Sequence, residues 1–158
     1  MTASTPTPAP RYLAPGWFTR RVGNPFVQWL TRRGLPIRGS RELRVVGRSS
    51  GQVRAVPVNP IEVDGVTYLV APRGTTQWVR NLRAAGEGEL VVGRRRERFR
   101  AAELDDATAK VAVLRPYLTK WKMEVGAFFE GVGPDATDAE LEAITGNHPV
   151  FAVEFGVE

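Results

Sequence analysis

The stretch that decides the fold class is residues 41–71, RELRVVGRSSGQVRAVPVNPIEVDGVTYLVA. Residues 41–48 read as a strand, a Ser-Ser-Gly turn follows, and residues 52–63 continue in an extended conformation. Pro57 and Pro60 cannot donate to a strand ladder, so this second stretch is predicted to lie at a sheet edge or at a bulge. The order of strand, tight turn and strand indicates antiparallel pairing.

Further hairpins are predicted downstream. Asp64-Gly65 is a strong turn signal before a strand at 66–71. Another hairpin joins residues 88–93 and 96–104 and is expected to turn at the Arg94-Arg95-Arg96 run. Antiparallel pairing through short turns, rather than βαβ alternation, indicates an α+β fold with a small barrel.

Helices are expected between and after these strands. A short helix is predicted over about 75–85. The region 105–130 keeps the helical spacing of apolar residues, but Pro116 lies inside it, so two helices are predicted there. Thr137-x-x-Glu140 is a capping box that begins another helix. Residues 149–155 are predicted to form the last strand.

The N-terminal region differs in composition from the rest. Residues 1–10 are rich in Pro, Thr and Ala, so we expect a disordered tail over 1–15 and a single domain over 16–158. A helix predicted over 24–33 has an apolar stripe flanked by arginines; it either packs on the core or touches acidic lipid. With no run of about 20 apolar residues, the protein is expected to be cytoplasmic, with peripheral contact to the inner face of the membrane left open.

The composition restricts the chemistry of the chain. Its 158 residues include no Cys and one His, His148, so disulfides, thiolate chemistry and a multi-His site are excluded, and no metal site is predicted. The chain has 22 basic and 17 acidic residues, and all but three of the basic residues are arginines. Arginine holds phosphate and carboxylate groups with a planar fork of donors, so an anionic partner is expected.

Common nucleotide and hydrolase motifs are absent from the sequence. It holds neither a GxxxxGK[ST] phosphate loop nor GxGxxG, and Ser49 and Ser50 lack the GxSxG context of a nucleophile. The arginine run over 94–100 suits single-stranded nucleic acid, but aromatic residues are not interleaved regularly. A nucleic-acid-binding barrel is therefore the least favoured alternative, and no nucleic-acid partner is expected.

Two segments carry the positive signal for a binding site. Residues 47–57, GRSSGQVRAVP, present N–H groups and hydroxyls in a turn flanked by Arg48 and Arg54, which suits an anion. Residues 71–82, APRGTTQWVRNL, run from a strand end into a helix whose N-terminus favours negative charge. On the residues alone, a plain hairpin with solvated arginines, and a core Trp beside a helix-stabilising Asn, stay open as alternatives.

Together, the two segments resemble the deazaflavin-dependent nitroreductase family, small split-barrel proteins of actinobacteria that use coenzyme F420. That family shows G-x-x-S-G-x-x-R-x-x-P and then A-x-[KR]-G followed by W-x-x-N-L. The matching residues here are Gly47, Ser50, Gly51, Arg54, Pro57, Ala71, Arg73, Gly74, Trp78, Asn81 and Leu82. The resemblance covers about 24–156 and is closest over 43–86. It implies a small antiparallel split β-barrel with flanking helices.

The resemblance also implies which residues bind the cofactor, F420 or, in a related branch, FMN. Residues that would hold the phosphate and the glutamate tail are Arg48, Ser49, Ser50, Gly51 and Arg54, with Ala71, Arg73 and Gly74. Val56, Pro57 and Val58 would lie beside the ring, and Trp78 and Asn81 would support the wall. Many members carry a second basic residue where this chain has Ser49, so Arg48 would serve alone.

The implied activity is hydride transfer from reduced F420 to an electron-poor small molecule: a quinone, an enone or a nitroaromatic. Tyr117 is expected to donate a proton to the reduced product. Trp121 and Phe128 share its helical side and are expected to form a wall of the substrate pocket. A carrier or sensor that binds F420 without turnover is the alternative, and the oligomeric state is left open between monomer and homodimer.

Overall fold

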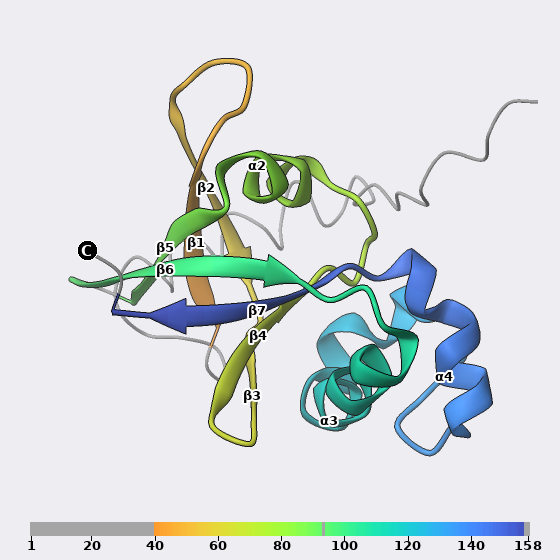
Figure 1. The fold of residues 1–158 in the computed structure, drawn as a ribbon. Helices are drawn as coiled ribbons and strands as arrows, with labels where there is room; N and C mark the ends of the chain where they lie inside the picture. The colour runs from red at the N-terminus through yellow and green to blue at the C-terminus, as the bar shows by residue number, and fades with distance from the viewer. Residues whose placement is uncertain (1–39, 93, 157–158) are drawn as a thin grey trace, which may run out of the picture.

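The computed structural model describes residues 40–92 and 94–156, which form a seven-stranded sheet with helices against it (Figure 1). The strands are β1 (Arg41–Val46), β2 (Val53–Val58), β3 (Ile61–Val63), β4 (Val66–Val70), β5 (Glu87–Val92), β6 (Arg95–Glu103) and β7 (Val150–Phe155). The helices are α2 (Gln77–Ala85), α3 (Ala107–Val125) and α4 (Asp138–Ile144), with short 3-10 turns over Gly126–Phe128 and Thr145–Asn147. Strand order is β2-β1-β5-β6-β7-β4-β3, and all neighbours pair antiparallel. The predicted α+β class is confirmed.

The sheet curls because its two ends are adjacent in the chain. β2 and β3 are the end strands, yet only Asn59 and Pro60 separate them. Two hydrogen bonds hold this corner: Ser40 Oγ donates to Asn59 Oδ1 at 2.8 Å, and Trp121 Nε1 donates to the Pro60 carbonyl at 3.1 Å. The run 52–63 is therefore two strands at opposite ends of the sheet, not one extended stretch. The predicted small antiparallel split barrel with flanking helices is confirmed.

The hairpin turn predicted at Asp64-Gly65 is present. Asp64 and Gly65 both have positive φ, 51° and 80°, which is the type I′ geometry that a two-residue hairpin requires. β2 pairs only with β1 among the described strands, so Pro57 lies in an edge strand, as predicted. The turn predicted at Arg94-Arg95-Arg96 lies slightly earlier in the chain than expected, because β6 already begins at Arg95.

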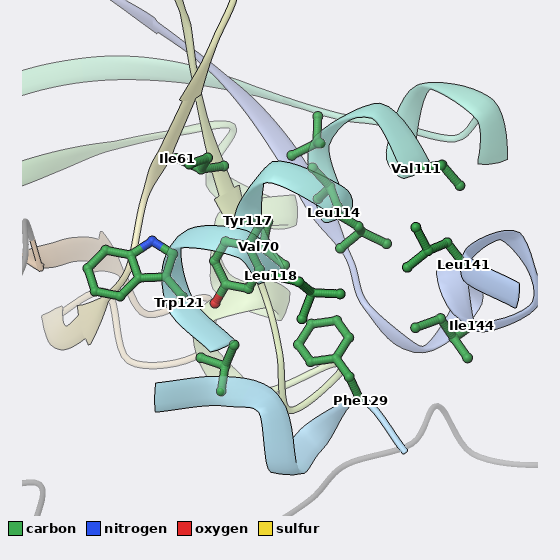
Figure 2. Close-up of a cluster of buried hydrophobic side chains, with 13 residues drawn as sticks. Ile61, Val70, Val111, Leu114, Tyr117, Leu118, Trp121, Phe129, Leu141 and Ile144 are labelled. Carbon is green, nitrogen blue, oxygen red and sulfur yellow. The ribbon is translucent and has the colours of Figure 1, made fainter. Parts of the chain in front are cut away.

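Two groups of buried side chains form the core. One lies between the sheet and α2 and includes Leu43, Leu82 and Phe99. The other lies between α3, α4 and the β3–β4 end of the sheet; Figure 2 shows its aromatic members, among them Trp121 and Phe129. In Figure 1, α2 accordingly lies near β1, α3 lies near β3 and β4, and α4 packs against α3.

One continuous helix, α3, occupies most of the region in which two helices were predicted. That prediction was wrong. Proline inside a helix costs roughly 3 kcal/mol or more, because it removes an N–H and crowds the preceding turn. Leu114, Tyr117, Leu118 and Trp121 on both sides of Pro116 are nevertheless fully buried against the same cluster. Burial stabilises each large apolar side chain by about 1.5–3 kcal/mol, so together they outweigh the proline.

The remaining predicted elements are present with small shifts of boundary. Thr137 caps α4, its hydroxyl accepting from Glu140 N at 3.2 Å, which confirms the capping box. The helix predicted over 75–85 is α2, and β7 begins one residue later than predicted. The tail over 1–15 and the helix over 24–33, with its expected lipid contact, lie outside the described residues.

Within 40–92 and 94–156, no helix has the length and apolarity needed to span a membrane. The same part of the chain contains no grouping of acidic and histidine side chains suited to a metal ion.

Candidate functional site

A cleft of about 580 Å³ lies where the β1–β2 hairpin, the chain after β4 and the start of α2 meet. Most of the residues predicted to bind the cofactor line it: Arg48, Ser49, Ser50, Arg54, Val56, Pro57, Val58, Ala71, Arg73, Trp78 and Asn81. Tyr117 of α3 also lines it. The tertiary structure thus brings the two motif segments of the sequence to one site.

Three hydrogen bonds tie the hairpin turn to α2. Asn81 Oδ1 accepts from both the backbone N–H of Arg48, at 3.2 Å, and its Nη1, at 2.8 Å. The same Nη1 lies 2.9 Å from Gln77 Oε1. Asn81 is 5% exposed, so its side chain is held in place by packing as well. The contacts fix the Arg48 guanidinium at the rim of the cleft.

The turn itself depends on a close approach at Gly47. Its N–H donates to the Gln52 carbonyl at 2.7 Å and closes the hairpin. A Cβ at this position would lie 2.7 Å from Ser50 Oγ, a distance that real Cβ atoms essentially never show. The Gln52 carbonyl oxygen would lie 3.2 Å from the same Cβ, so a side chain at position 47 would crowd the turn.

The rim of the cleft is electropositive. Arg48, Arg54 and Arg73 line it, and no Asp or Glu is among its described lining residues. Gln77 and Asn81, the described partners of the Arg48 guanidinium, are neutral and add no negative charge beside it. A guanidinium in this state favours carboxylate or phosphate ligands.

The inner part of the cleft is apolar but contains polar atoms that lack partners. Val56, Val58 and Val70 contribute apolar walls. The Tyr117 hydroxyl and Thr76 Oγ1 are buried and have no hydrogen-bond partner among the described residues. A buried polar group left in this way costs about 1–3 kcal/mol, so a ligand that supplied partners would be favoured.

Burial controls the ionisation of Tyr117. Desolvation, with a smaller contribution from the Glu124 carboxylate, raises the pKa of its phenol well above the ordinary value of 10.0. The phenol is therefore neutral throughout the physiological range and offers a hydrogen-bond donor.

Four predicted site residues lie outside this lining. Gly51 is in the exposed hairpin turn and Gly74 is in the turn after β4. Trp121 is fully buried in the α3 core, with its indole N–H on Pro60, and Phe128 packs against that same core. Sequence spacing placed Trp121 and Phe128 on one helical side, but it did not show that these two side chains pack into the core.

Several lining residues were not identified from the sequence, among them Asn59, Thr76 and Gln77. A signal existed for Gln77, because it lies four residues before Asn81 and so on the same helical face. No local signal pointed to Asn59, whose place depends on the corner between the two ends of the sheet.

The arginine run of β6 lies away from the cleft and faces acidic residues. Arg95 pairs with Glu97 at 3.2 Å, and Arg98 lies 3.9 Å from Glu87 on β5. Arg96 and Arg100 continue the run and are exposed. These glutamates offset part of the positive charge of the hairpin.

Comparison with solved structures shows the same fold. An F420-H2 dependent reductase superposes with a TM-score of 0.52 at 20% identity, covering 74% of this chain and 95% of that one. A chain described as a domain-swapped dimer gives 0.54 at 18% identity, covering 82% and 95%. A conserved hypothetical protein from Mycobacterium tuberculosis gives 0.51 at 13% identity, covering 75% and 73%. None of the curated proteins matches the sequence.

The family comparison is more specific than the fold. Residues 19–124 match the family described as F420H(2)-dependent quinone reductase, and this span includes both motif segments and Tyr117. The resemblance to deazaflavin-dependent reductases is thereby confirmed, as are an F420-dependent oxidoreductase activity and F420 as cofactor. The chain belongs to the F420H(2)-dependent quinone reductase family.

Proposed function

We propose that the cleft binds F420 along the Arg48–Arg54 turn and that the protein uses it to reduce a small planar quinone. The observation that carries this proposal is the division of a single cleft into an apolar interior with a buried phenol and an arginine-lined rim that has no carboxylate among its described residues. The description of the matching family supports the choice of a quinone. Enones and nitroaromatics share the same electron-poor character and are the competing acceptors.

The residues of the cleft fit the two parts of F420. Its tail carries a phosphate and a chain of glutamates, which Arg48, Arg54 and Arg73 would hold by charge-assisted hydrogen bonds. Ser49, Ser50 and the neighbouring Gly51 would add hydroxyl and N–H donors, and Ala71 and Gly74 would border the tail. This arrangement suits a polyanion better than it suits FMN, which carries one phosphate.

The flat ring fits the apolar part of the cleft. Val56, Pro57 and Val58 would lie beside it, and Trp78 with Asn81 would form the opposite support. The acceptor would lie on the ring face within this cleft. Trp121 and Phe128 are not proposed to contact it, because neither is among the described residues that line the cleft, whereas Tyr117 is.

When bound, reduced F420 supplies a hydride; a quinone that gains this hydride and one proton becomes a hydroquinone. The protein orients the reactants and excludes water with its apolar walls. Tyr117 donates a hydrogen bond to an oxygen of the acceptor, where negative charge develops. Because the pKa of this phenol is raised, we assign it hydrogen-bond donation and take the proton from solvent at the arginine-lined mouth.

The test is a titration with F420 in which the fluorescence of Trp78, the Trp that lines the cleft, reports binding. Arg54→Ala is compared with Arg98→Ala, an exposed arginine of β6 that removes the same charge away from the cleft. Loss of a charge-assisted bond should weaken F420 binding by about tenfold or more in the first variant and little in the second. The rate of menadione reduction with reduced F420 should likewise fall in Arg54→Ala and change little in Arg98→Ala.

Tighter binding of FMN than of F420, or equal loss in the two variants, would contradict the proposed site. Binding of F420 without menadione reduction, together with turnover of an enone or a nitroaromatic, would replace the proposed acceptor.

A further inference from the structure

The cleft runs along the edge of β2 that pairs with no other strand among the described residues. Ala55, Val56, Pro57 and Val58 are consecutive in this strand, and all of them line the cleft. Successive side chains of a strand point to opposite faces of the sheet. Four consecutive residues therefore border one cleft only when it adjoins the edge of the strand, where the backbone is accessible.

The register shows which backbone groups lie at that edge. Gly47 N donates to Gln52 O, and the pairing continues in register as Val45↔Arg54 and Leu43↔Val56. In an antiparallel pair, every second residue directs its N–H and C=O toward the partner strand. The backbone groups of the residues between them, Val53, Ala55 and Pro57, therefore point away from β1.

Along the part of this edge that lines the cleft, Ala55 alone combines a donor with an acceptor. Its N–H and C=O point the same way and lie side by side, whereas Pro57 offers a carbonyl but has no N–H. A peptide strand that paired with this edge would need a backbone N–H donor at each outward-facing residue, and Pro57 has none. The edge instead suits a ligand that presents one N–H beside one C=O, as a cyclic imide does.

We propose that the backbone of Ala55, at the edge of β2, binds the imide of the cofactor's pyrimidinedione ring through two hydrogen bonds. The Ala55 N–H donates to a ring carbonyl, and the Ala55 C=O accepts from the ring N–H. This inference rests on the proposed placement of the ring in the cleft. It assigns recognition of the ring to the backbone, so the ring is identified by its imide, independently of the charged tail held by the arginines.

Two perturbations test the pairing from both sides. The first is chemical: F420 is compared with its imide-N-methyl derivative, which keeps the tail but loses the ring N–H. The second is Ala55→Pro, which removes an N–H that makes no bond to β1 and is therefore compatible with the sheet. Val53→Pro is the matched control, since it removes another outward N–H of β2, at a residue that does not line the cleft.

Dissociation constants from Trp fluorescence are the readout, so no turnover is needed. We expect methylation to weaken binding to the unmodified protein about tenfold, and Ala55→Pro to weaken F420 binding to a similar extent. Val53→Pro should bind F420 like the unmodified protein. Methylated F420 should show little further loss on Ala55→Pro, because the imide pairing is already broken.

Equal binding of F420 and its methylated form by the unmodified protein would overturn the pairing while leaving the proposed function intact. Unchanged F420 binding by Ala55→Pro would overturn it as well. Failure of the unmodified protein to bind F420 would overturn the proposed function together with this inference. Circular dichroism establishes whether Ala55→Pro is folded; if it is not, the two ligands with the unmodified protein decide the matter.

Discussion

Asn81 offers the sharpest test of how the site is organised, because its single Oδ1 accepts two hydrogen bonds from Arg48. Asn81→Leu keeps the volume approximately and removes both acceptor contacts. A typical intramolecular hydrogen bond contributes about 1 kcal/mol net, so loss of the pair should lower the free energy of unfolding by about 2 kcal/mol. For a chain of 158 residues, this corresponds to a fall in Tm of roughly 4–8 °C.

A double-mutant cycle divides this loss between the two bonds. Arg48→Ala removes the Nη1 contact but retains the backbone N–H that donates to Asn81. In that background, Asn81→Leu should therefore cost only about 1 kcal/mol, half of its cost in the unmodified protein. Gln77→Leu is the control, since Gln77 accepts one exposed bond from the same guanidinium, and should cost under about 0.5 kcal/mol.

Urea denaturation gives the free energies, and F420 titration gives the functional consequence. Asn81→Leu should weaken F420 binding because Arg48 is no longer held at the rim of the cleft. The reasoning is refuted if Asn81→Leu costs the same with and without the Arg48 side chain, or if it destabilises the fold and leaves F420 affinity unchanged.

Three further substitutions test packing and burial. Tyr117→Phe should raise the free energy of unfolding of the ligand-free protein by about 1–2 kcal/mol, because it removes a buried hydroxyl without a partner, and it should slow quinone reduction. Because the pKa of Tyr117 is raised in the folded state, the unfolded chain loses this proton first; stability should fall as the pH rises above 10.0, and less steeply in Tyr117→Phe. Pro116→Ala should stabilise α3 by about 1–2 kcal/mol in a thermal melt, since it restores a helical N–H. Gly88→Ala should lower the Tm, with a cost of about 1–3 kcal/mol, because its Cβ would lie 2.8 Å from the Arg44 carbonyl and 3.1 Å from the Phe99 ring; an unchanged Tm would argue against this close packing.

Features set by neighbouring residues could be read from the sequence. The Asp64-Gly65 turn and the Thr137 capping box depend on contacts within a few residues, and both formed as predicted. The two motif segments also carried the family resemblance that implied the cofactor, whereas the residues alone indicated no more than an anion site. Arg48 and Asn81 were identified in this way, but not the bonds between them.

Tertiary packing decided what those local signals left open. Pro116 marks a helix break on local grounds, yet buried side chains on either side keep α3 continuous. Tyr117 and Trp121 lie one helical turn apart and are both fully buried against the same cluster, yet of the two Tyr117 alone lines the cleft, which spacing does not reveal. Within the described sheet, β2 has an unpaired edge because the chain turns at Asn59-Pro60 into β3 at the other end of the strand order, and these two end strands do not pair with each other. Turns and caps are selected by interactions over three or four residues, whereas burial and strand order depend on segments that are distant in the chain and meet only when the whole core forms.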